Sequence, residues 1–163
     1  MEKLNTNQKV FMSRLNNKFK FRLFSLFNLP MALISGLNIE NITMNQCETS
    51  VPFKFLNKNP FKSTYFANLS MAAELSTGAL ALLYVEGEQL DISLILTDMK
   101  ADFKKKAKGK TFFICKEGDE IREAVKKAVS SNSGQSIRVQ SLGYNTQEEL
   151  IAQFEFTWAF KKR

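Results

Sequence analysis

The sequence contains no histidine, only two cysteines and only three prolines among its 163 residues. Without histidine there is no Ser-His-Asp or Cys-His catalytic machinery and no metal site held by imidazole. Acid-base chemistry must therefore come from carboxylates, lysine, tyrosine or water. Cys47 and Cys115 lie far apart and outside any paired spacing. They predict neither a zinc site nor a disulfide framework, and we interpret them as buried thiols in a reducing cytosol.

The N-terminal region lacks the features of a secretory signal. The apolar stretch 21–37 is interrupted by Arg22, Asn28, Pro30 and Gly36, and no brief basic region or cleavage site precedes it. We therefore expect a cytoplasmic protein without a transmembrane segment.

Hydrophobic residues make up 44% of the chain and charged residues 24%, the balance of an ordered protein. The length predicts one domain over 1–163, with 1–30 as a helical extension. Fifteen phenylalanines suggest a large, dry core. The formal charge of +7 favours an anionic partner: a nucleotide-bearing cofactor, an acidic carrier protein, a membrane surface or nucleic acid. Nucleic acid is not expected, because no recognition motif accompanies the charge.

Residues 6–27 have the spacing of one amphipathic helix that ends at Pro30. Its predicted apolar face holds Val10, Phe11, Leu15, Phe19, Leu23 and Leu26, and its basic face holds Lys9, Arg14, Lys18 and Arg22. We interpret it as a helix docked on the domain with a solvated basic face. Contact of this helix with a membrane surface is the less favoured alternative.

Two strands are predicted next, at 37–45 and 49–56. Val51, Phe53 and Phe55 alternate on one side of the second strand, and Pro52 indicates an edge position or an irregularity. The loop 57–60 follows.

The segment 66–85 is the strongest helix prediction, because it is apolar all round and free of proline. Its many small side chains predict a buried helix that a sheet approaches closely. Glycine costs roughly 1 kcal/mol in a helix interior, so Gly78 indicates that another group passes close to it. One charge, Glu74, interrupts the interior of this helix.

The rest of the sequence predicts a sheet with one inserted helix. Strands are predicted at 91–100 and 110–116, and a helix near 119–131. Two further strands close the chain, and the last is the clearest because apolar residues alternate from Leu150 to Phe160.

This order of elements, together with the segment Asn59–Glu74 (NPFKSTYFANLSMAAE), resembles the hotdog-fold acyl-CoA thioesterases, most closely a little-characterised thioesterase-like branch. Many of those enzymes have an Asn, a Gly, a His-Gly-Gly turn that opens the central helix, and an acidic residue fifteen positions after the Asn. Asn59 and Glu74 keep that spacing, whereas Lys62 replaces the Gly and Tyr65-Phe66-Ala67 replaces the turn. The resemblance implies an α+β hotdog fold in which a curved antiparallel sheet wraps a long central helix.

The resemblance also implies a catalytic set of Glu74, Asn59 and Phe66. The backbone N–H of Phe66 would polarise the thioester carbonyl, and Asn59 would fix the turn or orient water. Glu74, expected from a partner subunit, would activate water or attack directly, and its apolar surroundings should raise its pKa. The alternatives are a structural Glu74 bonded to Ser70, Thr77 or a tyrosine, and an ordinary turn at Asn59.

Substrate-binding candidates are Tyr65, Ser70, Lys104, Lys105 and Lys106. Tyr65 is expected to form an aromatic wall, or to donate a hydrogen bond. The lysines would bind the phosphates of coenzyme A, with a solvated hairpin as the alternative.

The resemblance thus implies hydrolysis of an acyl-CoA or acyl carrier protein thioester, with coenzyme A only as part of the substrate and no separate cofactor. A non-catalytic acyl or CoA binder remains the alternative, and a dehydratase is disfavoured because the relatives with that activity rely on histidine. A homodimer or a dimer of dimers is expected, because paired subunits cover an otherwise open sheet edge.

Overall fold

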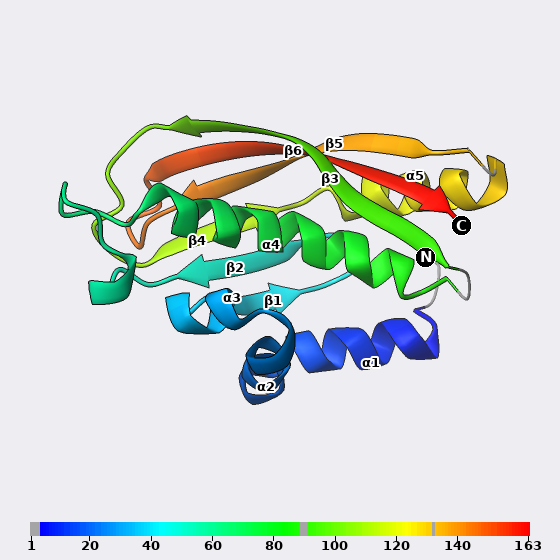
Figure 1. Cartoon of the computed structure of the whole chain (residues 1–163), viewed down its shortest axis with the longest axis horizontal. Helices are drawn as coiled ribbons and strands as arrows, with labels where there is room; N and C mark the ends of the chain where they lie inside the picture. Colours follow the sequence, from blue (N-terminus) through cyan, green and yellow to red (C-terminus); the bar gives the residue numbers. More distant parts are fainter. Residues whose placement is uncertain (1–3, 89–90, 132) are drawn as a thin grey trace.

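The computed structural model describes residues 4–88, 91–131 and 133–163 and places one long helix against the concave face of a curved sheet (Figure 1). The helices are α1 (Thr6–Leu15), α2 (Lys18–Asn28), α3 (Pro30–Ser35), the short 3-10 helix η1 (Phe55–Asn57), α4 (Phe66–Val85) and α5 (Gly118–Ser131). The strands are β1 (Asn38–Ile42), β2 (Cys47–Val51), β3 (Ile92–Phe103), β4 (Thr111–Cys115), β5 (Gln135–Tyr144) and β6 (Leu150–Lys162).

The six strands form one antiparallel sheet in the order β1-β2-β4-β5-β6-β3. The two ends of this order, β1 and β3, are the edge strands of the single chain. β3 pairs with β6 along nearly its whole length, from Ile92 opposite Lys162 to Phe103 opposite Ala152. The α+β hotdog architecture predicted from the sequence is confirmed.

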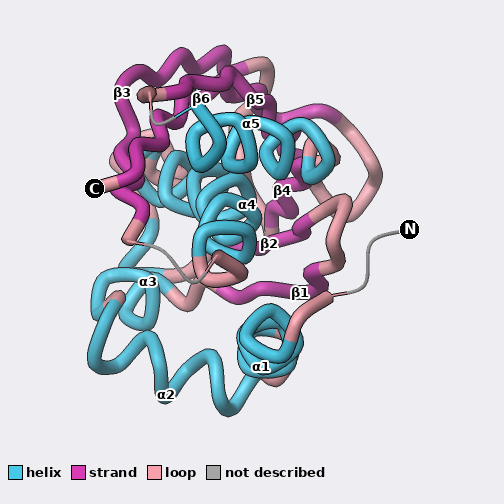
Figure 2. Tube along the Cα trace, turned by 90° about the vertical axis from the view of Figure 1, so that its right-hand side faces the viewer, coloured by secondary structure: helices cyan, strands magenta, loops and turns pink. Residues whose placement is uncertain are grey.

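Helix α4 lies in the concavity of the sheet, with the strands around it and the N-terminal helices beneath β1 (Figure 2). Its small side chains let the sheet approach, since Ala72, Ala73, Gly78 and Ala79 are all buried. On the sheet side the core is built largely by β6, where Phe154, Phe156, Trp158 and Phe160 point inward. The alternation predicted for the last strand is therefore confirmed.

Hydrogen bonds between buried polar groups connect α4 to the sheet. The Thr49 hydroxyl donates to the carbonyl of Ala72 at 2.6 Å, and the Trp158 Nε1–H donates to the Thr77 hydroxyl at 3.0 Å. Each of these bonds satisfies a group that would otherwise be costly to bury. They fix the rotation of α4, and with it the direction in which the start of the helix faces.

Within the described residues, α4 is the one helix long and apolar enough to cross a membrane by length and composition. Of its most apolar 18-residue window, 61% is buried inside the protein. The wrapping of α4 by the sheet accounts for its composition.

The N-terminal region differs from the prediction of one docked helix over 6–27. The chain breaks at Asn16-Asn17 into α1 and α2, and Pro30 starts α3 as its first residue. The backbone of Asn16 is still helical, and the chain leaves the helical path at Asn17, which has φ −100° and ψ 110°. The side-chain amide of Asn16 anchors this break because it bonds both backbone groups of Ile42, accepting from the N–H at 2.8 Å and donating to the carbonyl at 2.9 Å. Asn17 then caps α2 by accepting from the Lys20 N–H. The basic residues remain exposed as predicted, but part of the predicted apolar face does not dock.

The second predicted strand is also shorter than expected. β2 ends at Val51 because Pro52 has no N–H to continue the ladder, and Phe55 begins η1. Phe53 and Phe55 are consequently exposed, which corrects the prediction that they share a strand face with Val51. The prediction that the phenylalanines are mainly core residues is only partly right, since several are more than half exposed: Phe19, Phe27, Phe55, Phe61 and Phe66.

Candidate functional site

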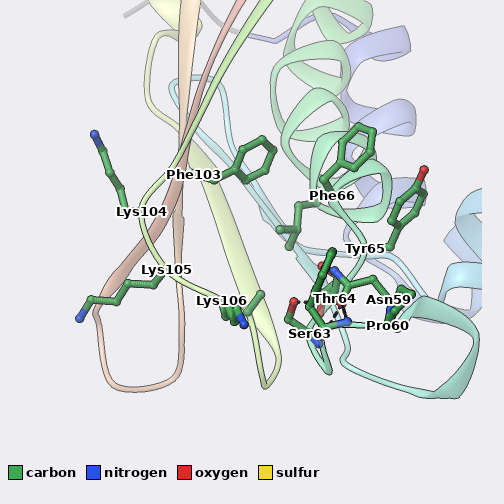
Figure 3. Close-up of a pocket in the computed structure, with 13 residues that line it drawn as sticks. Asn59, Pro60, Ser63, Thr64, Tyr65, Phe66, Phe103, Lys104, Lys105 and Lys106 are labelled. Carbon is green, nitrogen blue, oxygen red and sulfur yellow. Dashed lines mark hydrogen bonds between the residues drawn. The ribbon is translucent and has the colours of Figure 1, made fainter.

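The start of α4 opens on a cavity of about 570 Å³ between the loop before the helix and the end of β3. The cavity holds most of the residues singled out in the sequence, and Figure 3 shows their arrangement. Its lining comprises Asn59, Pro60, Phe61, Ser63, Thr64, Tyr65, Phe66, Leu69, Phe103, Lys104, Lys105, Lys106 and Ala107.

Two backbone N–H groups at this helix start have no partner. Tyr65 is the N-cap residue with an extended backbone, and its side chain makes no capping hydrogen bond. The N–H groups of Phe66 and Ala67 donate to no described residue, whereas those of Asn68 and Leu69 bond the carbonyl of Tyr65. Unpaired donors at the positive end of a 20-residue helix form a site for a developing negative charge.

Asn59 holds the loop that leads into the helix. Its side-chain oxygen accepts from the N–H of Phe61 at 3.0 Å and from the N–H and hydroxyl of Ser63 at 3.2 Å, while its Nδ2 donates to the carbonyl of Thr64 at 3.4 Å. Both ends of the amide are thus engaged in the turn. This geometry favours the turn-fixing role of Asn59 over the orientation of water.

Lys62 stands where the resembling enzymes have glycine, and its backbone retains the conformation that glycine adopts easily. Its φ of 58° lies in the left-handed region, which costs a side-chain-bearing residue roughly 1 kcal/mol or more. The local path of the chain therefore survives the loss of the glycine.

Aromatic rings form the apolar wall of the cavity. The rings of Phe66 and Phe103 lie edge-to-face with centroids 6.4 Å apart, and Tyr65 packs edge-on against Phe66 at 4.8 Å (Figure 3). This packing supports the aromatic-wall interpretation of Tyr65. Sequence reasoning missed Phe61 and Phe103. The position of Phe103 directly before the lysine run was the available signal, and only the fold brings that run to the start of α4.

The three lysines predicted to bind phosphate differ in direction. Lys104 pairs with Asp102, and Lys105 pairs with Glu149 at 2.6 Å, and both side chains point away from the cavity (Figure 3). Lys106 instead lies at the rim, with its ammonium 5.9 Å from the centre of the Phe61 ring. Of the three, Lys106 is the cation placed to meet an anionic ligand in the cavity.

Glu74 and Ser70 lie outside this cavity. Glu74 lies eight positions after Phe66, or about 12 Å along the helix. The Glu74 carboxylate is half-buried, has no hydrogen-bond or ion-pair partner among the described residues, and burial raises its pKa. Ser70 donates its hydroxyl to the Phe66 carbonyl at 2.9 Å. The Thr77 hydroxyl donates to the Glu74 backbone carbonyl at 3.0 Å, but no Ser70, Thr77 or tyrosine side chain bonds the Glu74 carboxylate among the described residues.

Gly78 is the point of closest approach on α4. A Cβ added there would lie 2.8 Å from Glu74 Oε1 and 3.2 Å from the ring of Trp158. The predicted close passage at Gly78 is confirmed, and the missing side chain leaves room for the Glu74 carboxylate.

Comparison with known proteins places this architecture in a family. The model of a family described as a domain of unknown function, DUF4442, matches residues 19–160. The chain belongs to the DUF4442 family. No curated protein matches the sequence.

Solved structures share the fold at low sequence identity. A Pseudomonas aeruginosa protein of unknown function, described as a probable thioesterase, is 21% identical, with a TM-score of 0.74 over 87% of this chain and 93% of that one. A thioesterase from Haemophilus influenzae is 10% identical, with a TM-score of 0.63 over 90% of this chain and 91% of that one. A Chlorobaculum tepidum protein of unknown function is 16% identical, with a TM-score of 0.74 over 93% of this chain and 99% of that one. This DUF4442 chain thus has the hotdog fold of thioesterase-like proteins.

Proposed function

We propose that this DUF4442 chain hydrolyses the thioester of an acyl-CoA or an acyl carrier protein. The observation that carries the proposal is the pair of unpaired N–H groups, on Phe66 and Ala67, at the positive end of α4 beside an apolar cavity. Such donors stabilise the oxyanion that forms when a thioester carbonyl is attacked. The resemblance of Asn59–Glu74 to hotdog thioesterases and the shared fold support the same reaction class.

In the proposed reaction, Glu74 acts as the general base. The carboxylate takes a proton from water while the water oxygen bonds to the thioester carbon, and the carbonyl electrons move onto the oxygen held by the Phe66 N–H. Collapse of this intermediate breaks the carbon–sulfur bond, and the proton on Glu74 passes to the departing thiolate. The products are a carboxylic acid and a thiol. Burial favours this role, since a raised pKa makes the Glu74 carboxylate a stronger base.

The proposed site needs two subunits, because Glu74 and the cavity lie apart in one chain. Strand β3 offers the means of association: it is an edge strand whose Ile95 and Met99 are exposed. Pairing of two β3 strands in a homodimer, or in a dimer of dimers, would cover this edge. It would also bring the partner's α4, with its Glu74, toward the cavity of the first chain.

The lining of the cavity indicates the substrate class. Phe61, Phe66, Leu69 and Phe103 suit an acyl chain, and Lys106 suits a phosphate of coenzyme A or of a phosphopantetheine arm. Coenzyme A would enter only as part of the substrate, and we place the reaction in the cytoplasm.

A non-catalytic acyl or CoA binder is the second candidate. It is favoured by the engagement of both ends of the Asn59 amide in the turn and by the replacement of the His-Gly-Gly turn. A binder would retain the ligand and release no thiol.

The decisive experiment removes the donor and keeps the helix. Phe66 is the first residue of α4, where proline fits, and Tyr65 before it has φ −63° and ψ 135°, which a following proline permits. Phe66→Pro therefore deletes one N–H and the ring, while Phe66→Ala deletes the ring alone. Thiol release would be measured with acyl-CoA substrates of increasing chain length.

We expect Phe66→Pro to lower kcat about 100-fold or more relative to Phe66→Ala, as for the loss of one oxyanion donor. Phe66→Ala should mainly raise KM for longer chains. Equal rates for the two variants would remove the Phe66 N–H from the mechanism. Binding of acyl-CoA by the wild type without thiol release would favour the binder.

A further inference from the structure

Helix α2 exposes an apolar stripe on the side opposite to the one that docks on the protein. The exposed fractions are 77% for Phe19, 52% for Leu23 and 52% for Leu26, whereas Phe21 is buried. The spacing of 19, 23 and 26 places the three exposed residues along one face at 3.6 residues per turn. A stripe of this kind has nothing to cover it within the described part of the chain.

The stripe belongs to a larger apolar surface. Phe27 at the end of α2 is 77% exposed, and Met31 and Ile34 on α3 are also exposed. Helix α3 packs against η1, where Phe55 and Leu56 are exposed as well. Single exposed apolar residues are ordinary, but a continuous group of this kind marks an interaction surface. We call Phe19, Leu23, Leu26, Phe27, Met31 and Ile34 the α2–α3 surface.

Cations border this surface, and carboxylates are absent from its segment. On the helical wheel, Lys20 and Arg22 fall on the two flanks between the exposed stripe and the buried face. Neither has an ion-pair partner among the described residues, and residues 4–39 contain no Asp or Glu. Long basic side chains beside an apolar stripe reach the headgroups of a bilayer while the apolar side chains enter it.

Charge also argues against a second copy of this chain as the occupant. In a two-fold contact the same surface meets itself. The cationic flanks of Lys20 and Arg22 would then meet a surface that carries the same positive charge, with no carboxylate from residues 4–39 to neutralise it. An anionic lipid surface supplies the missing negative charge.

We infer that the α2–α3 surface docks this protein on membranes that carry anionic lipids. The helix lies in the plane of the interface, with the stripe in the boundary between headgroups and acyl chains and with Lys20 and Arg22 among the headgroups. No turnover is needed for this docking, which is independent of the proposed hydrolysis. The surface leads along α3 and η1 to the loop that begins the cavity at Asn59, so docking brings the mouth of the cavity near the lipid.

The test is co-sedimentation of the full chain with vesicles. One set contains phosphatidylcholine alone, and the other contains about 30% phosphatidylserine. We expect the wild type to bind the anionic set, and binding to weaken as salt increases, because exposed charges are screened. Phe19→Gln/Leu23→Gln/Leu26→Gln should lower the partition coefficient about tenfold or more, with the folded state checked by its melting curve.

Matched charge variants separate a local surface from a general attraction of a basic protein. Lys20→Gln/Arg22→Gln should reduce binding to anionic vesicles about tenfold. The control Lys116→Gln/Lys127→Gln removes the same charge from two exposed lysines away from the α2–α3 surface and should reduce binding by less than about threefold. Equal losses from the two pairs would overturn the proposal.

A spectroscopic readout completes the test. Trp158 is the only tryptophan and is buried, so in the Phe27→Trp variant any change on adding vesicles reports on position 27. We expect its emission to shift to shorter wavelength with anionic vesicles. No shift together with no co-sedimentation would refute lipid docking. A lower oligomer mass for the glutamine triple variant, with vesicle binding unchanged, would assign the surface to a contact between copies and would equally refute it.

Discussion

Gly78 links the packing of α4 to the position of the proposed base. The Cβ of Gly78→Ala would lie 2.8 Å from Glu74 Oε1 and 3.2 Å from Trp158 Cζ2. The carboxylate ends a flexible side chain and can rotate away, whereas the ring is held by its bond to Thr77 and must shift by a few tenths of an ångström. Alanine gains about 1 kcal/mol in helix propensity, which offsets a mild overpacking of similar size. Gly78→Ala should therefore melt within about 2 °C of the wild type.

The Gly78→Ala change should lower the catalytic rate more than it lowers the stability. The new methyl group occupies the space of the Glu74 carboxylate, and a misplacement of about 1 Å can cost up to 100-fold in rate. We expect kcat of Gly78→Ala to fall at least about tenfold. Gly78→Leu adds three further carbons against the buried ring, costs about 3 kcal/mol and should lower the melting temperature by roughly 6–12 °C.

The assay pairs thermal melting with thiol release, and the control is Gly109. A Cβ added at Gly109 meets nothing within 4 Å, so Gly109→Ala and Gly109→Leu should leave both readouts unchanged. A Gly78→Leu protein that melts at the wild-type temperature would refute the close packing. Full turnover by Gly78→Ala would show that the carboxylate position near Gly78 is irrelevant to the reaction.

Three further predictions concern ionisation and backbone strain. Burial tends to raise the pKa of Glu40, but hydrogen bonds led by that from Lys110 outweigh it and lower the pKa from 4.5 to about 2. Glu40 therefore stabilises the fold above pH 4.5, and this stability is lost as the pH falls toward 2. Glu40→Gln should flatten the dependence of the melting temperature on pH in that acid window, and an unchanged slope would contradict this assignment. Burial raises the pKa of Glu74, so its contribution to stability is complete below pH 4.5 and is lost as the pH rises through its folded pKa. Glu74→Gln should therefore melt higher than the wild type at pH 8 and not at pH 4, and a lower melting temperature at pH 8 would indicate that the carboxylate is a structural group. Lys62→Gly should keep or raise the melting temperature by up to about 4 °C because it relieves the left-handed φ, and a clear fall would show that the lysine side chain itself holds the turn.

The elements whose structure follows from their own composition and spacing were predictable from the sequence. Segment 66–85 forms a helix within the predicted bounds because its composition suits burial on every side. The alternation at the end of the chain likewise predicts which residues of β6 face the core. Most of the candidate site residues lie around the cavity, whereas Glu74 and Ser70 lie outside it. The candidates that line the cavity are Asn59, Tyr65, Phe66, Lys104, Lys105 and Lys106.

Features that depend on long-range contacts were missed. The break between α1 and α2 comes from the bonding of Asn16 to Ile42, a residue 26 positions away, which no local pattern contains. Because of that break, α2 buries Phe21 and turns Phe19 outward. The approach of Phe103 to Phe66 similarly arises from the pairing of β3 with β6, so the apolar wall could not be read from spacing.

A mixed dimer tests the central claim most directly, because the proposed site joins the Phe66 N–H of one subunit to Glu74 of the other. Glu74→Gln and Phe66→Pro chains would each be expressed alone and confirmed inactive, and would then be co-expressed in equal amounts and purified together without sorting the dimers. In a shared site, half of the randomly formed dimers regain one intact site of two, so thiol release should return to about a quarter of the wild-type rate. Mixed dimers that stay as inactive as their parents would contradict a thioester site built across two subunits.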